Sequence, residues 1–395
     1  MDRHPEVEGL KIDLPVSGGR LETYRLRGPK AFSKPSKPFM RVAFAAAHVV
    51  ADPLSAKEPW LDAAVDWDAT IAYRRHLWSW GFGVAEAMDT AQRGMGLDWR
   101  NSLELVGRTL AAAKDCAGAV VASGAGTDHL PHSKNHSMQD ILSAYEEQCA
   151  AIEKLGGRII LMASRALAAS AKSPDDYAKV YDRILGQVKA PVIIHWLGEM
   201  FDPALEGYWG KKDHAEAMDV CLSVLERNKS KVDGIKISLL DKHKEIAMRR
   251  RLPAGVRMYT GDDFNFAELI EGDARGHSDA LLGIFDSIAP AASQALSFLS
   301  ADEKEKYHET LAPTVPLSRH IFQAPTRFYK TGVVFMAWLN GHQAHFVMVG
   351  GQQSARSALH LAELFTLADK AGLLLDPDRA ATRMRAFLAV QGIAA

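Results

Sequence analysis

The sequence predicts an α/β protein built on a (β/α)8 TIM barrel, with an N-terminal hairpin and a C-terminal helical extension. Between residues 40 and 290, short apolar runs alternate with amphipathic stretches of helical period, which is typical of a parallel sheet with helical crossovers. A doubly wound open sheet shows the same alternation, but no GxGxxG motif follows the first run, so we favour the barrel. Eight such runs, the number that closes a barrel, are present: Val42–Ala47, Gly83–Met88, Ala119–Ser123, Ile159–Ala163, Val192–Trp196, Gly234–Leu239, Val256–Tyr259 and Ala280–Ile284.

Ahead of the first run, the segment 1–38 is predicted to form a hairpin and a connector. The alternating stretches Leu10–Pro15 and Gly18–Tyr24 meet at a Ser-Gly-Gly sequence, which is a hairpin signal. The polar, proline-rich stretch Lys34–Pro38 then leads into the first barrel strand. We expect the hairpin to cap the floor of the barrel.

Helical stretches fill the intervals between the apolar runs, and each ends near a glycine or a polar break. The clearest of them are Asp66–Trp80, Asn101–Ala113, Gln139–Lys154, Asp175–Gln187 and Ala215–Arg227. We therefore assign residues 39–290 to one barrel domain.

Residues 291–395 are predicted to be a helical region packed on the barrel. The stretch Phe328–Leu339 is apolar nearly all round and should be buried, Ser354–Ala371 is amphipathic, and a last helix begins at Pro377. These helices are more hydrophobic than the outer layer of a monomer requires, so we expect a homodimer or a larger even oligomer.

Composition restricts the function classes. The net charge is −1, with 47% apolar and 24% charged residues and neither a basic stripe nor an acidic tail. Nucleic acid and membrane surfaces are therefore excluded as expected partners, which leaves a small molecule. The three cysteines are far apart and form no CxxC motif, and no run of about 18 apolar residues is present, so we expect a cytoplasmic protein without disulfides.

The chemically distinctive residue is Lys236, which lies inside the apolar run Val232–Asp241. A buried ammonium group is costly, so it must reach solvent, find a carboxylate or lose its proton. In the last case the amine can attack a carbonyl carbon and form a Schiff base. Lysines at strand ends more often point to solvent, so the residue alone leaves both interpretations open.

A resemblance adds weight to the nucleophile. The sequence Val-Asp-Gly-Ile-Lys at 232–236, followed by Gly261-Asp262-Asp263, is similar to the sixth and seventh strands of the dihydrodipicolinate synthase and N-acetylneuraminate lyase superfamily. The chain resembles a divergent branch of that superfamily. The resemblance implies a class I aldolase or lyase in which Lys236 forms the Schiff base with a small oxo acid or a keto sugar, leading to C–C cleavage, condensation or dehydration without a cofactor.

The chain departs from the superfamily pattern at two strands. Where the superfamily has Gly-Thr-Thr-Gly-Glu after strand two, this chain has Met88–Gly94. Where strand four should end in Pro-Tyr-Tyr, which supplies the proton-relay tyrosine, it has Leu161–Arg165. We therefore do not transfer a preference for pyruvate.

Polar residues at the carboxyl ends of the predicted strands supply the remaining candidates, because barrel enzymes place their reacting groups there. In the imine hypothesis, Lys236 attacks the carbonyl, His195 or Asp89 moves protons, and Arg165 or Arg93 holds an anionic group. The expected catalytic residues are Lys236, His195 and Asp89, and the expected substrate-binding residues are Thr90, Arg165, Glu199, Asp262 and Asp263.

Two alternatives stay open. Imidazole and carboxylate groups on the same rim could bind a divalent metal for a sugar lyase or isomerase reaction, with Glu86, Asp89, Asp128 and His195 as ligands. The chain could also be a barrel-shaped binding protein that has lost catalysis.

Overall fold

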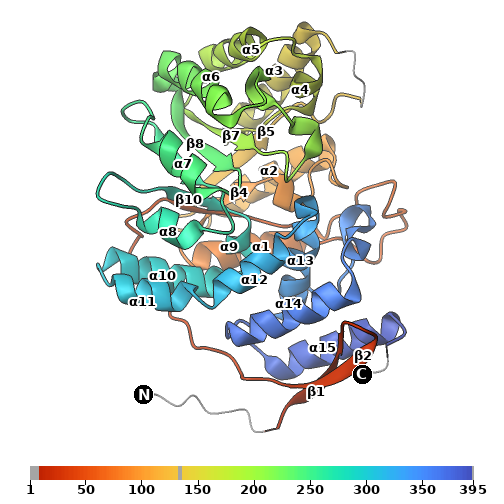
Figure 1. Cartoon of the computed structure of the whole chain (residues 1–395). Helices are drawn as coiled ribbons and strands as arrows, with labels where there is room; N and C mark the ends of the chain where they lie inside the picture. Colours follow the sequence, from red (N-terminus) through yellow and green to blue (C-terminus); the bar gives the residue numbers. More distant parts are fainter. Residues whose placement is uncertain (1–8, 132–135, 394–395) are drawn as a thin grey trace.

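The computed structural model describes residues 9–131 and 136–393, and within them eight parallel strands close into a barrel (Figure 1). The predicted TIM-barrel fold is therefore confirmed. The strands pair in the order β10-β3-β4-β5-β6-β7-β8-β9. Their bounds are β3 Ala43–Ala46, β4 Gly83–Glu86, β5 Val121–Ala125, β6 Arg158–Leu161, β7 Val192–Leu197, β8 Val232–Ser238, β9 Arg257–Thr260 and β10 Asp279–Leu282.

Helices connect the strands and surround the barrel, and the longer ones agree with the sequence prediction to within a few residues. Side-chain caps fix several of their starts: Asp66 accepts a hydrogen bond from the Ala69 amide, and Ser137 and Asp140 form a capping box. The helices are α1 Trp67–Ser79, α2 Trp99–Ala113, α3 Met138–Lys154, α4 Arg165–Ser170, α5 Pro174–Gln187, α6 His214–Arg227, α7 Lys242–Arg249, α8 Phe266–Glu271, α9 Ile284–Ser287 and α10 Ala289–Ser300.

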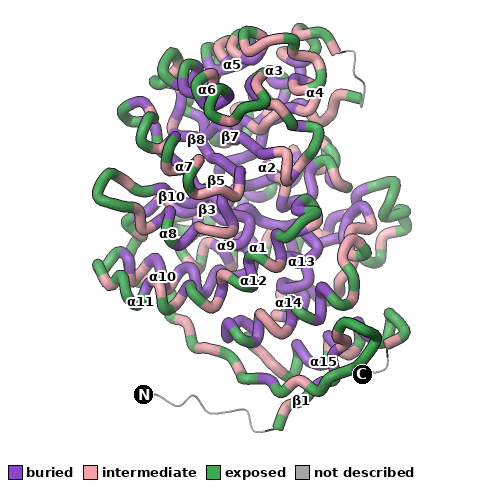
Figure 2. The backbone as a smooth tube through the Cα atoms, in the orientation of Figure 1, coloured by how far each residue is buried: buried purple, intermediate pink, exposed green. Residues whose placement is uncertain are grey.

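After α10, a helical region packs beside the barrel, as predicted. Helix α13 (Tyr329–Leu339) is buried along its whole length (Figure 2). It contacts α9 as well as its neighbours α12 (Thr314–Ile321), α14 (Ala358–Lys370) and α15 (Pro377–Val390), and α11 (Lys304–Leu311) packs on α10. The apolar surface of α13 is thus covered by other helices of the same chain. Its hydrophobicity is therefore no argument for a subunit interface.

The predicted hairpin is present as β1 (Lys11–Val16) and β2 (Arg20–Arg25), but it does not cap the barrel floor. It lies against α14 and α15 (Figure 1). The Tyr24 hydroxyl and the Arg27 amide both donate to the Asp369 carboxylate of α14, at 2.7 and 2.9 Å. The expected position on the barrel floor was wrong, because the hydrogen bonds from Tyr24 and Arg27 to Asp369 hold the hairpin against the C-terminal helices. Residues 1–8 of the predicted N-terminal segment lie outside the described part of the chain, and the division at residues 38 and 290 stays a prediction.

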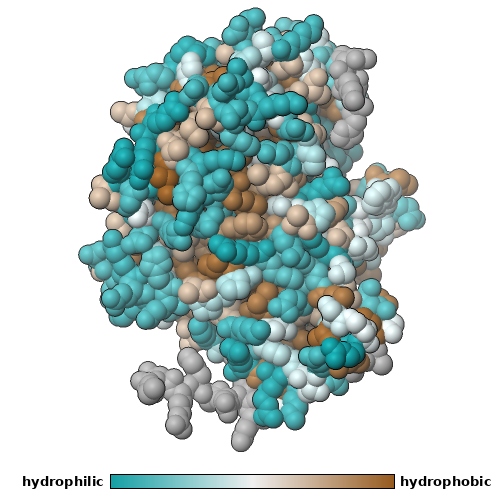
Figure 3. Space-filling model, viewed as in Figure 1, coloured by the Kyte–Doolittle hydropathy of each residue, from teal (hydrophilic) through white to brown (hydrophobic). Residues whose placement is uncertain are grey.

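The outer surface is mixed, with hydrophilic residues predominating around small apolar areas in the view of Figure 3. Three large apolar side chains are strongly exposed in the loop between β3 and α1: Leu54, Trp60 and Leu61, at 93, 78 and 75% exposure. No helix among the described residues is long and apolar enough to cross a bilayer. The even-numbered oligomer stays a prediction.

Alternate residues of each strand fill the barrel interior. Their apolar side chains form a cluster separate from the main core, and this cluster contains Phe44, Ala46, Ala85, Met88, Ala122, Ile160, Ile193, Tyr259 and Leu281. The outward-facing apolar residues of the strands pack against the surrounding helices and belong to the main core. Because both faces of the barrel sheet are covered, the strands are largely apolar on both sides.

Two glycines make room for large inward side chains on neighbouring strands. A Cβ at Gly234 would lie 2.6 Å from the Tyr259 ring, and a Cβ at Gly261 would lie 2.7 Å from Cε of Lys236. The glycines of the Val-Asp-Gly-Ile-Lys and Gly-Asp-Asp segments are thus packing requirements of the barrel interior.

A buried ion pair ties α1 to β4. Arg74 and Glu86 have fully buried side chains, and the guanidinium donates to both carboxylate oxygens at 2.9 and 2.8 Å. The Thr109 hydroxyl of α2 donates to the same carboxylate at 2.6 Å. Glu86 therefore points out of the barrel, toward the helices.

Replacing Arg74 with Met should lower the free energy of unfolding by about 3–5 kcal/mol, because Glu86 is left as an uncompensated buried charge. Urea denaturation measures the change. The double variant Arg74→Met/Glu86→Gln should recover part of the loss. Lys229→Ala, which removes a surface pair with Glu226, is the control and should change the stability by less than about 0.5 kcal/mol.

Replacing Gly261 with Ala should destabilise the barrel by about 1–3 kcal/mol, since the added methyl group would meet Lys236 and the Ile237 carbonyl oxygen, the latter at 2.6 Å. Gly186→Ala in helix α5, where the methyl group has open space, is the matched control and should be neutral or slightly stabilising. Equal melting temperatures for the two variants would contradict the packing argument.

Candidate active site

Lys236 faces the interior of the barrel from β8 and is 8% exposed. It pairs in register with His195 of β7 and with Tyr259 of β9. Its side chain borders a small inner chamber of about 10 Å³, enough for about one water molecule. The chamber is lined by Ala46, Met88, Asp89, Thr90, Leu197, Phe201, Lys236, Ser238, Asp263, Gly283 and Tyr329.

Burial governs the protonation of Lys236 and Asp263. It lowers the pKa of the Lys236 ammonium group, while the charges of Asp263 and Asp89 oppose the shift. Burial also raises the pKa of the Asp263 carboxyl to about 7, although the Ile284 amide donates to it at 2.9 Å and the Lys236 charge acts in the opposite direction. Both shifts favour the neutral amine beside the neutral acid.

His195 lies next to Lys236 as a neutral imidazole, because burial and the Lys236 charge lower its pKa well below the usual value. Its Nε2 is 3.2 Å from the Ser238 hydroxyl. Its Nδ1 is buried, has no hydrogen-bond partner among the described residues and lies 4.0 Å from the Asp89 carboxylate. The structure thus brings together the three predicted catalytic residues.

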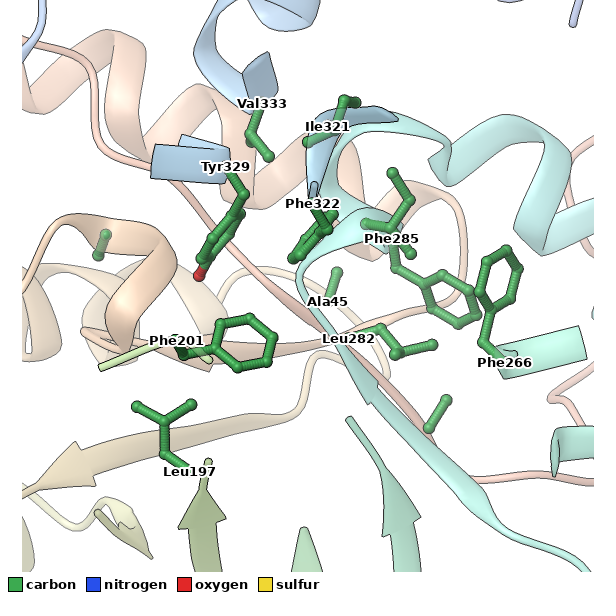
Figure 4. Close-up of a cluster of buried hydrophobic side chains, with 14 of the residues drawn as sticks. Ala45, Leu197, Phe201, Phe266, Leu282, Phe285, Ile321, Phe322, Tyr329 and Val333 are labelled. Carbon is green, nitrogen blue, oxygen red and sulfur yellow. The ribbon is translucent and has the colours of Figure 1, made fainter. Parts of the chain in front are cut away.

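Tyr329 was missed by the sequence analysis. It is the first residue of α13, and its hydroxyl is 2.8 Å from the Thr90 hydroxyl. Burial raises the pKa of Tyr329 well above its usual value, so the phenol is neutral. The ring stacks on Phe322 at 4.3 Å and meets Phe201 edge-on at 6.1 Å (Figure 4). No local signal in an apolar helix marks its first residue as a site residue.

The end of β6, where the superfamily has its tyrosine, carries no phenol in the chamber. Ser164 caps the start of α4 there, and its amide donates to the Tyr208 hydroxyl at 3.0 Å. The Tyr145 hydroxyl donates to the Met162 carbonyl at 2.6 Å. Neither tyrosine lines the two cavities described for this site.

A second buried amine, Lys330, follows Tyr329. Its Nζ lies 3.2 Å from both the Met95 sulfur and the Arg327 carbonyl oxygen, and burial lowers its pKa to about 8. It lines neither cavity, so its amine is not aimed at either space.

Beside the inner chamber lies an outer cavity of about 460 Å³. The two spaces share Asp89 and Leu197, which therefore stand at their junction. The outer cavity is lined by Asp89, Arg93, Gly126, Thr127, Asp128, Leu130, Pro131, His136, Met162, Ala163, Arg165, Ala166, Ala169, His195, Leu197, Asp202, Ala204 and Leu205.

Most charged groups on the wall of the outer cavity are paired with one another. Arg93 donates two hydrogen bonds to the Asp128 carboxylate, at 2.9 and 2.7 Å. Arg165 donates a hydrogen bond from Nε to the Asp202 carboxylate. Asp202 also caps the short helix η2 (Pro203–Leu205). Arg165 thus lies in the cavity where an anion-binding group was predicted, with its charge balanced by Asp202.

The other predicted substrate-binding residues divide between the inner chamber and the outside. Thr90 and Asp263 line the inner chamber. Asp262 does not reach either cavity, because its carboxylate accepts hydrogen bonds from the Phe264 and Asn265 amides at 2.9 and 3.0 Å and shapes the turn after β9. Glu199 is 38% exposed beside His214, 3.4 Å away, and also lies outside both cavities.

The residues of the alternative metal site are not gathered in one place. Glu86 is held by Arg74 outside the barrel, and Asp128 is held by Arg93. Only Asp89 and His195 lie close together. Across residues 9–131 and 136–393, no group of three or more His, Cys, Asp or Glu side chains has an arrangement suited to a metal ion.

Comparison with solved structures identifies relatives of the same fold. A putative dihydrodipicolinate synthetase from Pseudomonas aeruginosa is 14% identical, with a TM-score of 0.64 over 84% of this chain and 99% of that chain. Dihydrodipicolinate synthase from Aquifex aeolicus is 11% identical, with a TM-score of 0.63 over 85% of this chain and 100% of that chain. YagE, a prophage protein of the dihydrodipicolinic acid synthase family from E. coli in complex with pyruvate, is 12% identical, with a TM-score of 0.65 over 85% and 99%.

These likenesses confirm, for the fold, the resemblance predicted from the Gly-Ile-Lys and Gly-Asp-Asp segments. No curated protein sequence matches the chain. A family model described as "Protein of unknown function (DUF993)" matches residues 12–393. Because this match spans nearly the whole sequence, the chain belongs to the DUF993 family.

Proposed function

We propose that the protein is a lyase of the class I aldolase type, in which Lys236 forms a Schiff base with a small oxo compound. One observation carries the proposal: the amine of Lys236 is buried inside the barrel, with its pKa lowered, between the acid Asp263 and the unpaired imidazole nitrogen of His195. Only the neutral amine is a nucleophile, so the lowered pKa increases the reactive fraction at neutral pH.

The charges in the chamber suit imine formation. The Lys236 nitrogen attacks the carbonyl carbon, the carbonyl oxygen takes up protons, and water leaves. Asp263, with a pKa of about 7, exists in both protonation states near neutral pH and can give and take these protons. Neutral His195 can then remove a proton from the carbon next to the imine, which gives the enamine that forms or breaks the C–C bond.

Tyr329 and Thr90 supply the hydroxyl pair of this mechanism. Their oxygens are 2.8 Å apart, and both residues line the chamber of Lys236. A neutral phenol with a hydrogen-bonded neighbour can pass a proton to the leaving hydroxyl group of the carbinolamine. In this proposal, helix α13 takes over the role that the superfamily gives to the tyrosine after strand four.

Substrate binding requires movement at the junction of the two cavities. An inner chamber of about 10 Å³ cannot hold an oxo acid. Leu197 and Phe201 close the chamber on the β7 side, below Tyr329 in Figure 4. The substrate therefore enters from the outer cavity and displaces these two side chains to bring its carbonyl to Lys236.

The fold supports the proposal, since two structural relatives, YagE and a dihydrodipicolinate synthase from Acinetobacter baumannii, were solved in complex with pyruvate, an oxo acid. A cytoplasmic location and a small-molecule partner stay predictions. A binding protein without catalysis is distinguished from the lyase by the experiments that follow.

Borohydride treatment in the presence of pyruvate or a longer 2-oxo acid should leave a reduced adduct on Lys236, identified by peptide mass spectrometry. Trapping should become faster as the pH rises, with a midpoint below the ordinary pKa of lysine, because the neutral amine is the nucleophile. Lys236→Arg should abolish the adduct, since guanidinium stays protonated.

Lys330→Arg is the matched control, because it alters the other buried amine and should leave the adduct in place. An adduct on Lys330 would overturn the assignment. Binding of oxo acids without any adduct would favour the binding protein.

Tyr329→Phe should slow the exchange of the oxo acid's C3 protons with D2O by about 10²–10⁴-fold, because it removes a proton-transfer group while keeping the ring packing. Proton NMR of the substrate measures the exchange. Tyr307→Phe, which removes a buried phenol bonded to the Ala267 carbonyl away from both cavities, is the control and should leave the rate unchanged. Equal rates for the two variants would remove Tyr329 from the mechanism.

A further inference from the structure

The lining of the outer cavity combines a few unpaired polar groups with a set of small apolar side chains. At the junction with the inner chamber stand Asp89 and the buried Nδ1 of His195, which has no hydrogen-bond partner among the described residues. At this junction a ligand with a polar head would find free hydrogen-bonding groups.

Much of the remaining wall is formed by small apolar side chains. Ala163, Ala166 and Ala169 come from the end of β6 and from α4, and Ala204 and Leu205 come from η2. Ala169 is exposed, so this wall reaches the mouth of the cavity. None of these side chains can donate or accept a hydrogen bond.

The other charged and hydroxyl groups of this wall are largely paired within the protein. Arg93 is bound by Asp128 and Gln148, Arg165 is bound by Asp202, and the Thr127 and Ser164 hydroxyls are 2.6 Å apart. A sugar would have to bury its hydroxyl groups against walls that offer few free partners, which is costly. An alkyl or aryl chain has no such requirement and gains from leaving water.

We infer that the outer cavity binds the apolar side chain of a 2-oxo acid, with the carbonyl carbon directed past Asp89 and Leu197 to Lys236. The inference rests on the proposed function and narrows its substrate from a small oxo acid or keto sugar to an oxo acid with a straight alkyl or aryl chain. A cavity of about 460 Å³ is in the size range of sites for small organic ligands, and far larger than pyruvate needs.

Isothermal titration with 2-oxo acids of increasing chain length tests the inference, from pyruvate through 2-oxohexanoate to 2-oxooctanoate. Each added methylene should tighten binding by up to about fourfold until the cavity is filled, which corresponds to the transfer of one CH₂ group from water. The same gain in affinity should appear in Lys236→Met, where no imine can form. This variant therefore measures binding in the cavity without the contribution of the covalent step.

Ala169→Leu should narrow the mouth and reduce the gain for 2-oxooctanoate while leaving the affinity for pyruvate unchanged. Ala111→Leu, at another exposed alanine on helix α2 outside both cavities, is the matched control and should keep the full gain. The melting temperature of each variant verifies that it is folded.

Three results would overturn the inference. The first is an affinity that does not depend on chain length. The second is a 2-oxo sugar acid that binds more tightly than 2-oxohexanoate. The third is tighter binding of 2-oxoadipate than of 2-oxohexanoate, with this preference lost in Arg165→Leu, which would show that the second carboxylate is bound. Trapping of pyruvate on Lys236 without a chain-length gain would leave the lyase proposal intact and reject the apolar cavity. A chain-length gain without trapping would retain the cavity and reject the lyase.

Discussion

The burial of an ionisable amine in the barrel is the constraint on which the site depends. Lys236 cannot stay charged in an apolar interior without nearby carboxylates, and it cannot fit without space on the next strand. Asp263 and Asp89 meet the first requirement and Gly261 meets the second. Burial also raises the pKa of Asp263, so the environment that weakens the base Lys236 weakens the acid beside it as well. The lowered pKa of Lys236 and the raised pKa of Asp263 therefore both follow from the burial of these two side chains in the barrel.

The barrel could be predicted from the sequence because its signal is periodic and long. Eight apolar runs at helical separations leave few other topologies. The position of Lys236 in one such run left its direction open, and the resemblance of the Val-Asp-Gly-Ile-Lys segment favoured the inward one. The contact between His195 and Asp89 was also within reach, since both follow the carboxyl ends of strands and those ends meet on one face of the barrel.

What the sequence could not provide is the direction of individual side chains. Strands that are buried on both faces lose the alternation of apolar and polar residues, so Glu86, which faces α1, could not be distinguished from an inward neighbour. Asp262 and Asp263 are adjacent and chemically identical, yet one shapes a turn and the other faces Lys236. Tyr329 reaches the site through a tertiary contact with Thr90, and no local pattern encodes a contact between residues so far apart.

The position of Tyr329 also sets the order in which the site is completed during synthesis. All the barrel strands precede α13 in the chain, so a ribosome makes Lys236 and its whole barrel before it makes the residue that closes the chamber. Domains fold largely in the order in which they emerge. A newly made barrel therefore lacks one wall of the chamber around Lys236 until α13 docks, and the aromatic contacts of Phe322, Tyr329 and Phe201 then complete that wall.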